Sequence, residues 1–303
     1  MEHFLGIMDF GMEELGGLLE KAGKIKAEWK AGAINNELGG RTLIMLFEKT
    51  STRTRLSFEA GMTQLGGHAI YADFKSSQLK KGETLADTAR VMSRYGQGIM
   101  ARLYRHADIL EIARNSSVPV INGLTDLEHP CQAMADLLTM KENGKLAKGR
   151  KFAFIGDCGF NMANSLMLAC AKFGMEVALV CPESCRPNPD FVREASKFSK
   201  VGIYHDIGVG VEGADVVYTD VWVSMGQEGE AEARLGEYAP YQVNSALLSR
   251  AKGDCIVMHC LPANRGQEIT NEVIDGKRSV VWDQAENRLH FQKALMLELM
   301  KKA

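Results

Sequence analysis

The sequence predicts an α/β fold of two doubly wound parallel-sheet domains, with a C-terminal helix that packs back on the first domain. Three observations lead to this prediction. Short apolar runs with strand character alternate with longer amphipathic runs along the whole chain. A basic, glycine-containing stretch over residues 143–150 divides this alternation into two series. The last amphipathic run has no strand after it, so we expect it to return to the first domain.

The first series of elements occupies residues 1–145. Its expected strands are residues 42–47, 68–71 and 118–121, each a short apolar run. Its expected helices are residues 52–65, 84–95 and 129–142, which repeat apolar side chains at helical spacing. The pair Asn143-Gly144 is typical of the end of a helix. The series therefore predicts three β-then-α units and a parallel sheet.

The second series occupies residues 146–283. Its expected strands are residues 152–155, 177–180, 215–218 and 255–258. Its expected helices are residues 162–173, 190–198 and 245–251. The final helix, from residue 284 to about residue 300, is assigned to the first domain together with the chain end at residue 303. The predicted domains are therefore residues 1–145 with 284–303, and residues 146–283.

Composition and charge exclude several classes of function. The chain has 303 residues, of which 46% are hydrophobic and 24% charged, and its formal net charge is −2. Such a balance does not predict binding to nucleic acid or to a membrane through bulk electrostatics. No apolar run approaches the roughly 20 residues that a membrane-spanning helix needs. We therefore expect small-molecule substrates, with any anion site built from a local group of arginines and backbone N–H groups.

The start of the chain and the cysteines predict a location. The first residues lack the basic flank and apolar core of a signal peptide. The seven cysteines are an odd number, which suits reduced thiols in a cytosolic enzyme. Cys181 and Cys185 have the spacing of a metal-binding pair, but no second pair matches them. We expect a cytoplasmic protein with no metal.

Open α/β sheets bind ligands beyond the carboxyl ends of their strands, so the segments that follow strands are the informative ones. After the first strand come Ser51-Thr-Arg-Thr-Arg55, with three hydroxyls and two arginines at a strand-to-helix turn. Free N–H groups at a helix start already attract anions, and arginine offers a planar fork suited to phosphate oxygens. A capping serine with two solvated arginines is the alternative, but one cap does not account for five donor-rich residues. The run predicts a phosphate-binding site.

Two further strand ends carry polar groups. His129 precedes Pro130 at a helix entrance, where an imidazole can donate to a carbonyl oxygen and stabilise charge that develops on it. A helix-capping histidine is the alternative. Residues 156–165 follow another strand, but they lack the third glycine of a dinucleotide-binding motif and hold an aspartate and two asparagines. We interpret this segment as a recognition loop for a small polar ligand.

The last two strand ends carry Asp220 and Cys260. Asp220 is suited to pair with an ammonium group, and the alternative is a helix cap. Cys260 stands beside His259, but neighbours on a strand point to opposite faces, so a nucleophilic pair is disfavoured against a cysteine that lines the pocket. Polar groups at five strand ends together predict a cleft for two polar substrates.

These segments resemble the aspartate/ornithine carbamoyltransferase family over nearly the whole chain. Ser51-Thr-Arg-Thr-Arg55 and His129-Pro-Cys-Gln132 resemble its carbamoyl-phosphate signatures. Asp220-Val-Trp-Val-Ser-Met-Gly226 and His259-Cys-Leu-Pro262 resemble the ornithine-type versions, whereas aspartate-type members carry His-Pro-Leu-Pro and lack Ser-Met-Gly. The segment 282–288 resembles the family's closing arginine motif.

The resemblance implies an enzyme that transfers the carbamoyl group of carbamoyl phosphate to the δ-amine of L-ornithine, giving L-citrulline and phosphate in arginine biosynthesis. It implies no cofactor. The implied carbamoyl-phosphate residues are Ser51, Thr52, Arg53, Thr54, Gln78, Arg102, His129, Gln132, Cys260, Leu261 and Arg288. The implied ornithine residues are Asn161, Asp220, Ser224 and Met225. The implied catalytic residues are Arg53, Arg102, His129 and Cys260. The family is built on trimers, so a homotrimer or a multiple of trimers is expected, with Gln78 lent by a neighbouring subunit.

Three departures from the family pattern concern the acceptor side. The family usually has asparagine where Phe160 stands and histidine where Asn264 stands, and the Lys80-Lys81 loop is closer to the aspartate type. A carbamoyltransferase with aspartate, putrescine or an acylated ornithine as acceptor is therefore the first alternative. A nucleotide-dependent oxidoreductase and a regulatory homologue without activity are more distant ones, disfavoured by the broken glycine motif and the intact arginine and histidine set.

Overall fold

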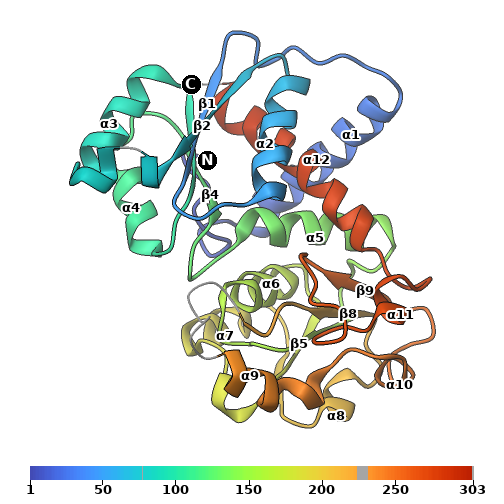
Figure 1. The fold of residues 1–303 in the computed structure, drawn as a ribbon. Helices are drawn as coiled ribbons and strands as arrows, with labels where there is room; N and C mark the ends of the chain where they lie inside the picture. The colour runs from blue at the N-terminus through green and yellow to red at the C-terminus, as the bar shows by residue number, and fades with distance from the viewer. Residues whose placement is uncertain (77, 224–230, 302–303) are drawn as a thin grey trace. The chain divides into compact units, whose positions relative to one another are not determined.

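The structure is a computed structural model that describes residues 1–76, 78–223 and 231–301 (Figure 1). The chain forms two compact units, each with its own sheet. The first unit comprises Met1–Met134 and Asn287–Ala303, and the second comprises Ala135–Glu286. The divisions fall inside helix α5 (Pro130–Glu142) and helix α12 (Val281–Met300), so each of these helices contributes residues to both units.

The first unit contains a four-stranded parallel sheet in the order β2-β1-β3-β4. The strands are β1 (Thr42–Phe47), β2 (His68–Asp73), β3 (Gly98–Arg102) and β4 (Val120–Leu124). The helices are α1 (Met12–Lys30), α2 (Thr52–Gln64), α3 (Leu85–Tyr95) and α4 (His106–Asn115), with short 3-10 turns η1 (Phe74–Ser76) and η2 (Gln78–Lys81). Helices α3 and α4 cover one face of the sheet, and α1, α2 and α12 cover the other (Figure 1). Helices on both faces confirm the doubly wound prediction for this unit.

The C-terminal helix packs on the first unit, as predicted. Lys26 Nζ of α1 donates to Asn287 Oδ1 at 2.8 Å, and Lys293 Nζ donates to Gln64 Oε1 of α2 at 3.0 Å. At Gly61 of α2 a Cβ atom would lie 2.9 Å from the Met296 Cε atom, so the glycine permits a close approach of the two helices. Side chains from both ends of the chain thus form one core.

The second unit contains a five-stranded parallel sheet in the order β7-β6-β5-β8-β9. The strands are β5 (Lys151–Ile155), β6 (Glu176–Val180), β7 (Val201–Tyr204), β8 (Val216–Thr219) and β9 (Ile256–His259). The helices are α6 (Asn161–Lys172), α7 (Pro189–Ala195), α8 (Ile207–Val211), α9 (Ala231–Tyr238), α10 (Ser245–Leu248) and α11 (Asn271–Ile274), with 3-10 turns η3 (Glu183–Cys185) and η5 (Ala239–Tyr241). Alternate strand residues such as Ala153 and Val257 belong to a core with Val211, Leu247 and Val273 from α8, α10 and α11. The fold class is therefore confirmed in both units.

Several elements were not predicted, because their local sequence preference is weak. Strand β3 begins at a glycine, a poor strand former, yet it lies between β1 and β4 and is almost fully buried. Strand β4 runs to Leu124, beyond the expected end at residue 121, although it contains Asn122 and Gly123. Backbone bonds of 2.8 Å join Phe4 N to Val120 O and Asn122 N to Phe4 O. A partner distant in sequence thus overrides a weak local preference.

The remaining elements outside the prediction are helical or at a sheet edge: α1, α4, β7, α8, α9 and α11. Helix α1 contains a Gly-Gly pair that weakens its helical pattern, but Leu15, Leu18, Leu19 and Ala22 are buried at helical spacing. None of the helices in the described parts of the chain combines the length and the apolar character needed to cross a bilayer.

Candidate active site

The predicted anion site lies at the start of α2, at the carboxyl edge of the first sheet. Strand β1 ends at Phe47, and Ser51 caps the 13-residue helix that follows. The Ser51 Oγ atom accepts the Thr54 backbone N–H at 3.4 Å and donates to Thr54 Oγ1 at 3.1 Å. The N–H groups of a first helical turn carry a partial positive charge. This serine therefore has the capping role that was the alternative interpretation, and its cap leaves it beside the N–H groups of the predicted anion site.

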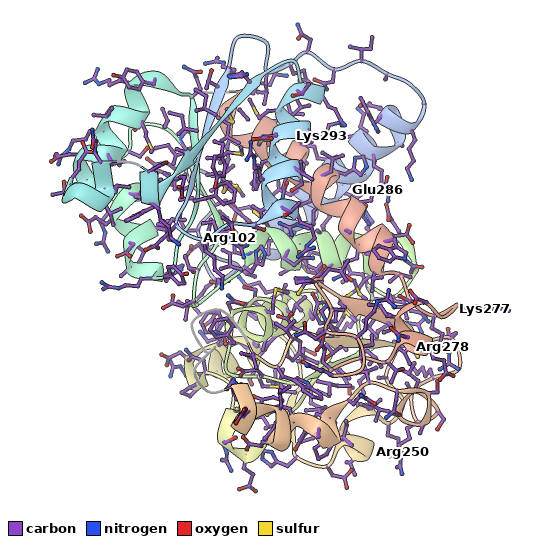
Figure 2. All side chains as sticks on the ribbon, in the orientation of Figure 1. Arg102, Arg250, Lys277, Arg278, Glu286 and Lys293 are labelled. Carbon is purple, nitrogen blue, oxygen red and sulfur yellow. The ribbon has the colours of Figure 1, made fainter. Side chains whose placement is uncertain are left out.

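Two arginines converge on the buried Thr54 side chain. Arg288 of α12 donates from Nη2 to Thr54 Oγ1 at 2.7 Å. Arg102, at the end of β3 and labelled in Figure 2, donates from Nη1 to the same oxygen at 3.4 Å. Two guanidinium groups therefore meet beside the positive end of a helix, which is the charge arrangement that a phosphate group requires.

His129 joins this group as a neutral base. It is buried immediately before Pro130, the first residue of α5. Burial holds the pKa of His129 well below its ordinary value, and the positive charges of Arg288 and Arg102 lower it further. A neutral imidazole carries one N–H, which can donate to a carbonyl oxygen without adding charge. The nearby Cys131 is inert as a nucleophile, because burial raises the pKa of its thiol to about 12.

The other predicted donor residues of the first unit lie on α2, α5 and η2. Thr52 and Arg53 occupy the first turn of α2, with Thr52 exposed and Arg53 half-buried. Gln132 is buried in the first turn of α5. Gln78 begins η2 and is exposed, on an element other than those that carry Thr54, Arg102 and Arg288. The structure therefore brings Ser51, Thr54, Arg102, His129 and Arg288 together, and it leaves Gln78 apart from them.

In the second unit, Asp220 and Cys260 meet at the carboxyl ends of β8 and β9. Cys260 Sγ donates to Asp220 Oδ1 at 2.9 Å, and the Val221 N–H donates to the same oxygen at 2.8 Å. Desolvation raises the pKa of Asp220, although nearby His259 and both hydrogen bonds oppose the change. Desolvation also raises the pKa of Cys260, and the Asp220 charge raises it further. Cys260 is therefore a hydrogen-bond donor rather than a thiolate nucleophile.

His259 does not act as a base for Cys260, because both of its ring nitrogens bond elsewhere. Its Nδ1 atom accepts the Leu261 N–H at 2.9 Å, and its Nε2 atom lies 3.0 Å from Glu268 Oε1. Both side chains are fully buried, and Glu268 also accepts the Asn264 N–H at 2.6 Å. This network fixes the loop that carries Cys260 and Leu261. His259 and Cys260 therefore do not form the nucleophilic pair that the sequence disfavoured.

One grouping in the second unit has the composition of a metal site. Single ligand atoms of Asp220, His259 and Cys260 lie within 4.8 Å of one another. The Leu261 N–H already occupies His259 Nδ1, and the Cys260 thiol bonds Asp220. Hydrogen bonds therefore account for the proximity of these three residues.

The recognition loop after β5 places Asn161 at the first position of α6, where its side chain is buried. Gly156 has a positive φ of 129°, a backbone conformation that favours glycine, and it allows the sharp exit from the strand. Phe160 occupies the N-cap position without a side-chain hydrogen bond to the helix. The two other predicted ornithine residues, Ser224 and Met225, lie outside the described residues.

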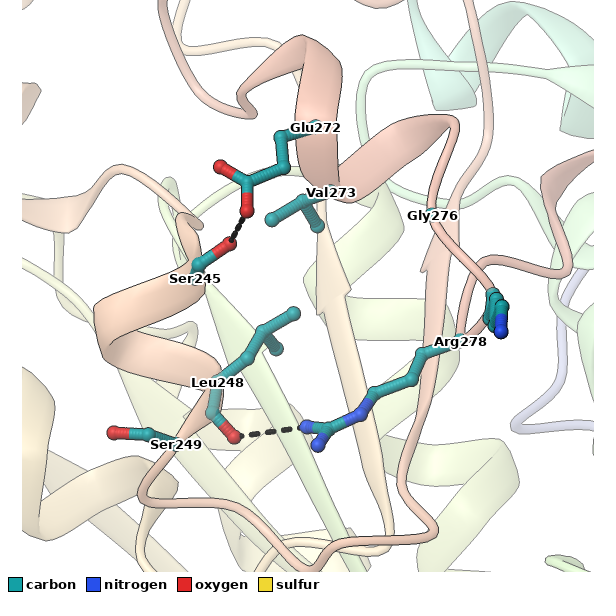
Figure 3. Close-up of a pocket in the computed structure, with 8 residues that line it drawn as sticks. Ser245, Leu248, Ser249, Glu272, Val273, Gly276 and Arg278 are labelled. Carbon is teal, nitrogen blue, oxygen red and sulfur yellow. Dashed lines mark hydrogen bonds between the residues drawn. The ribbon is translucent and has the colours of Figure 1, made fainter.

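A separate surface pocket of about 310 Å³ lies in the second unit (Figure 3). Its lining residues bond one another: Ser245 Oγ donates to Glu272 Oε1 at 2.7 Å, and Arg278 Nη1 donates to the Leu248 backbone carbonyl oxygen at 3.1 Å. None of the predicted site residues lines this pocket. It is therefore distinct from the candidate site.

Three buried groups next to the site residues were missed by sequence reasoning. They are Glu268, the Asp157–Arg234 ion pair and Gln284, whose Oε1 atom accepts the His259 N–H at 2.9 Å. Each acts on a residue at least nine positions away in the sequence. A spacing pattern cannot indicate them, because loops and strand order decide which distant residues meet.

Comparisons with known proteins agree with this geometry. Residues 2–142 match the family model "Aspartate/ornithine carbamoyltransferase, carbamoyl-P binding domain", and residues 148–299 match the "Asp/Orn binding domain" of the same family. An ornithine carbamoyltransferase of Archaeoglobus fulgidus is 50% identical over 303 residues, covering 100% of this chain and 98% of that protein.

Solved structures agree as well. An ornithine carbamoyltransferase structure from Pyrococcus furiosus has a TM-score of 0.95 and 48% identity, covering 99% of this chain and 97% of its own. An anabolic ornithine carbamoyltransferase structure from Campylobacter jejuni has a TM-score of 0.94 and 39% identity, with full coverage of both chains at 100%. With two family models spanning most of its length, the chain belongs to the aspartate/ornithine carbamoyltransferase family.

Proposed function

We propose that this protein transfers the carbamoyl group of carbamoyl phosphate to the δ-amine of L-ornithine, giving L-citrulline and phosphate. The observation that carries the proposal is the convergence of Arg102 and Arg288 on Thr54 at the start of α2. It supplies the charge for the phosphate of the donor. Relatives that are named ornithine carbamoyltransferase, with 50% and 51% of residues identical to this chain, support ornithine as the acceptor.

The donor is held by hydroxyls, backbone N–H groups and guanidinium groups. The proposed contacts are Ser51, Thr52, Arg53, Thr54, Gln78, Arg102, His129, Gln132, Cys260, Leu261 and Arg288. Phosphate oxygens would replace part of the contact that the arginines make with Thr54, because a charged acceptor forms stronger hydrogen bonds than a neutral hydroxyl. The site therefore has donors in place before the anion arrives.

The proposed reaction is acyl transfer. The neutral δ-amine attacks the carbamoyl carbon, a tetrahedral intermediate forms, and phosphate leaves with the bonding electron pair. Arg53, Arg102 and the N–H of neutral His129 stabilise the oxyanion, and donors of this kind contribute about 3–4 kcal/mol each in comparable sites. Because phosphate is a good leaving group and arginine supplies positive charge, the step needs no metal. The departing phosphate can accept the amine proton.

The acceptor is held by Asn161, Asp220, Ser224 and Met225. Asp220 pairs with the α-ammonium group of ornithine. The pKa of this carboxyl is raised in the free protein, and the positive charge of the ammonium group favours its ionised form. Cys260 bonds Asp220 and so orients it. The δ-amine of free ornithine should titrate near the lysine value of about 10.4, so the site must bind its deprotonated form.

The organisation around the reaction is part of the same proposal. Residues 1–145 with 284–303 form the carbamoyl-phosphate domain, and residues 146–283 form the ornithine domain. The protein works in the cytoplasm as a homotrimer or a multiple of trimers, with Gln78 lent to the next subunit. The exposed position of Gln78 in η2 is compatible with that role.

One experiment tests the activity and the acceptor together. The protein is incubated with carbamoyl phosphate and, separately, with ornithine, aspartate, putrescine or N-acetylornithine, and both phosphate release and carbamoylated product are measured. Citrulline formed from ornithine alone is the expected result. Activity with aspartate alone would show that aspartate, not ornithine, is the acceptor. Phosphate release that does not depend on any acceptor would show that the protein is not a transferase. An Arg53→Ala variant is the control for activity that a contaminating enzyme would supply.

A further inference from the structure

Arg234 of α9 joins two loops that carry proposed ornithine residues. Its guanidinium forms a buried ion pair with Asp157, in which Nη2 donates to Asp157 Oδ2. Its Nε atom donates to the Trp222 carbonyl oxygen at 3.1 Å. The two charged side chains expose only 10% and 8% of their surface. One side chain is therefore bound to two different strand ends at once.

The first of these attachments fixes the recognition loop after β5. Asp157 follows Gly156 at the exit from the strand, and its Oδ1 atom accepts the Gly159 N–H at 3.0 Å. Asn161 begins α6 two residues after Gly159. A displacement of Asp157 would therefore move the backbone that sets the position of Asn161.

The second attachment fixes the chain just after β8. Trp222 stands two residues beyond Asp220, and its indole is nearly fully buried. The Trp222 and Tyr238 rings lie 6.0 Å apart at an interplanar angle of 31°. The Arg234 guanidinium carbon lies 5.3 Å from the centre of the Tyr238 ring. The Tyr238 ring packs against the guanidinium and the Trp222 ring packs against Tyr238, so Arg234 is attached to the segments that carry Asp220 and Asn161.

A buried ion pair of this kind is weak evidence for stability, because the loss of hydration of both charges offsets their attraction. Its geometry has a more direct use, since a planar guanidinium donates in two fixed directions. A lysine ammonium could keep the pair with Asp157, but it has no rigid fork with which to reach Trp222 O as well.

We propose that Arg234 is a positioning residue that sets the separation of Asn161 and Asp220 and thereby the affinity for ornithine. The inference rests on the proposed function and deepens it. Arg234 acts through Asp157 and Trp222, and it has no role in carbamoyl-phosphate binding. The residues that carry it all lie in the second unit.

The test compares Arg234→Met, Arg234→Lys and Asp157→Asn with the wild-type protein. The ornithine KM and kcat are measured at saturating carbamoyl phosphate. The Kd of carbamoyl phosphate is measured by calorimetry without ornithine. Arg234→Met should raise the ornithine KM by about tenfold or more and leave the carbamoyl-phosphate Kd within about twofold. Arg234→Lys should give an intermediate KM, because it keeps one of the two attachments.

Two comparisons separate positioning from a general loss of structure. The variant Arg193→Met removes an exposed arginine of α7 that pairs with Asp190, where the side chains are 71% and 66% exposed, and both constants should stay unchanged. The double variant Asp157→Asn with Arg234→Met should raise the ornithine KM no more than about twofold above Arg234→Met alone, because both changes break one linkage. A partly unfolded preparation would lower kcat and leave KM unaltered.

The outcomes are distinct. If wild-type protein forms citrulline and all three variants keep the wild-type ornithine KM, the role of Arg234 is refuted while the proposed function stands. An equal loss of affinity for both substrates also refutes it. If Arg234→Met does not fold, Arg234→Lys and Asp157→Asn decide the question. A wild-type protein that forms no citrulline refutes the proposed function itself.

Discussion

The carboxyl edges of the two sheets hold opposite charges in comparable places. In the first unit, Arg102 and Arg288 meet at Thr54 beside a capped helix start. In the second unit, the corresponding helix start at Phe160 has no side-chain cap, and the charged group is the Asp220 carboxyl with its thiol donor. Both edges follow from the same β-then-α architecture. The difference shows that the fold supplies the position, and that a few side chains decide whether that position carries positive or negative charge.

The largest expected effect comes from removing charge at the cationic edge. Arg53→Ala should lower kcat/KM for carbamoyl phosphate by about 10³-fold, because one preorganised donor to the reacting group contributes several kcal/mol. The half-buried side chain should leave the melting temperature within a few degrees of wild type. Steady-state kinetics and circular dichroism test both parts, and near-normal turnover would remove Arg53 from the proposed site.

The reciprocal change at the anionic edge should have the next largest effect. Asp220→Asn keeps an oxygen for the Cys260 thiol and the Val221 N–H but loses the charge for the ammonium group. It should raise the ornithine KM about 10²-fold and leave carbamoyl-phosphate binding unchanged. Because desolvation raises the pKa of Asp220, its ionised form costs stability at neutral pH. The variant should therefore melt no lower than wild type, and a loss of carbamoyl-phosphate affinity would contradict the division between the two edges.

The pH dependence of stability sharpens the same comparison. The folded-state pKa of His129 is lowered by burial, Arg288 and Arg102, so the unfolded chain binds its proton more readily. The stability that neutral His129 contributes is present above the unfolded value of about 6.5 and is lost as the pH falls below it. Wild-type protein should therefore become less stable between pH 7.5 and pH 5. Urea unfolding should show a smaller loss in His129→Gln than in wild type, since His3 and His106 also have lowered pKa values and remain in the variant; equal losses in both proteins would contradict the role of His129.

The smallest expected effect concerns Cys260. Since its pKa is raised by desolvation and by Asp220, the thiol stays protonated at physiological pH and serves as a donor. Cys260→Ser keeps a donor, so kcat should fall by only about fivefold, or about 1 kcal/mol. The pH–rate profile should keep its shape. Loss of all activity in this variant would point to a nucleophilic role and break the proposed assignment.

Part of this arrangement can be predicted from the sequence. Ser51 at a strand-to-helix turn and His129 before Pro130 are local patterns, and the structure places both at the start of a helix. The fold class also follows from local periodicity, because the predicted strands and helices repeat apolar residues along the chain. The roles of the site residues stay predictions, since they depend on bound substrates.

The remainder depends on contacts between distant residues. Arg102 ends strand β3, which was not predicted because it begins with a glycine. Arg288 contacts Thr54, which lies 234 positions away in the sequence. Glu268 lies in a loop without a periodic pattern, yet it is fully buried against His259. Such partners are decided by strand order and helix packing, which a single sequence does not state.

The Arg288–Thr54 contact has a consequence for synthesis of the chain. The first unit is discontinuous, so the cluster around Thr54 includes Arg288, which is added to the growing chain after the whole second unit. A nascent or truncated polypeptide that ends before α12 lacks one of the two converging guanidinium groups, whatever the state of its sheet. We therefore expect such a truncated chain to bind inorganic phosphate less tightly than the 303-residue chain.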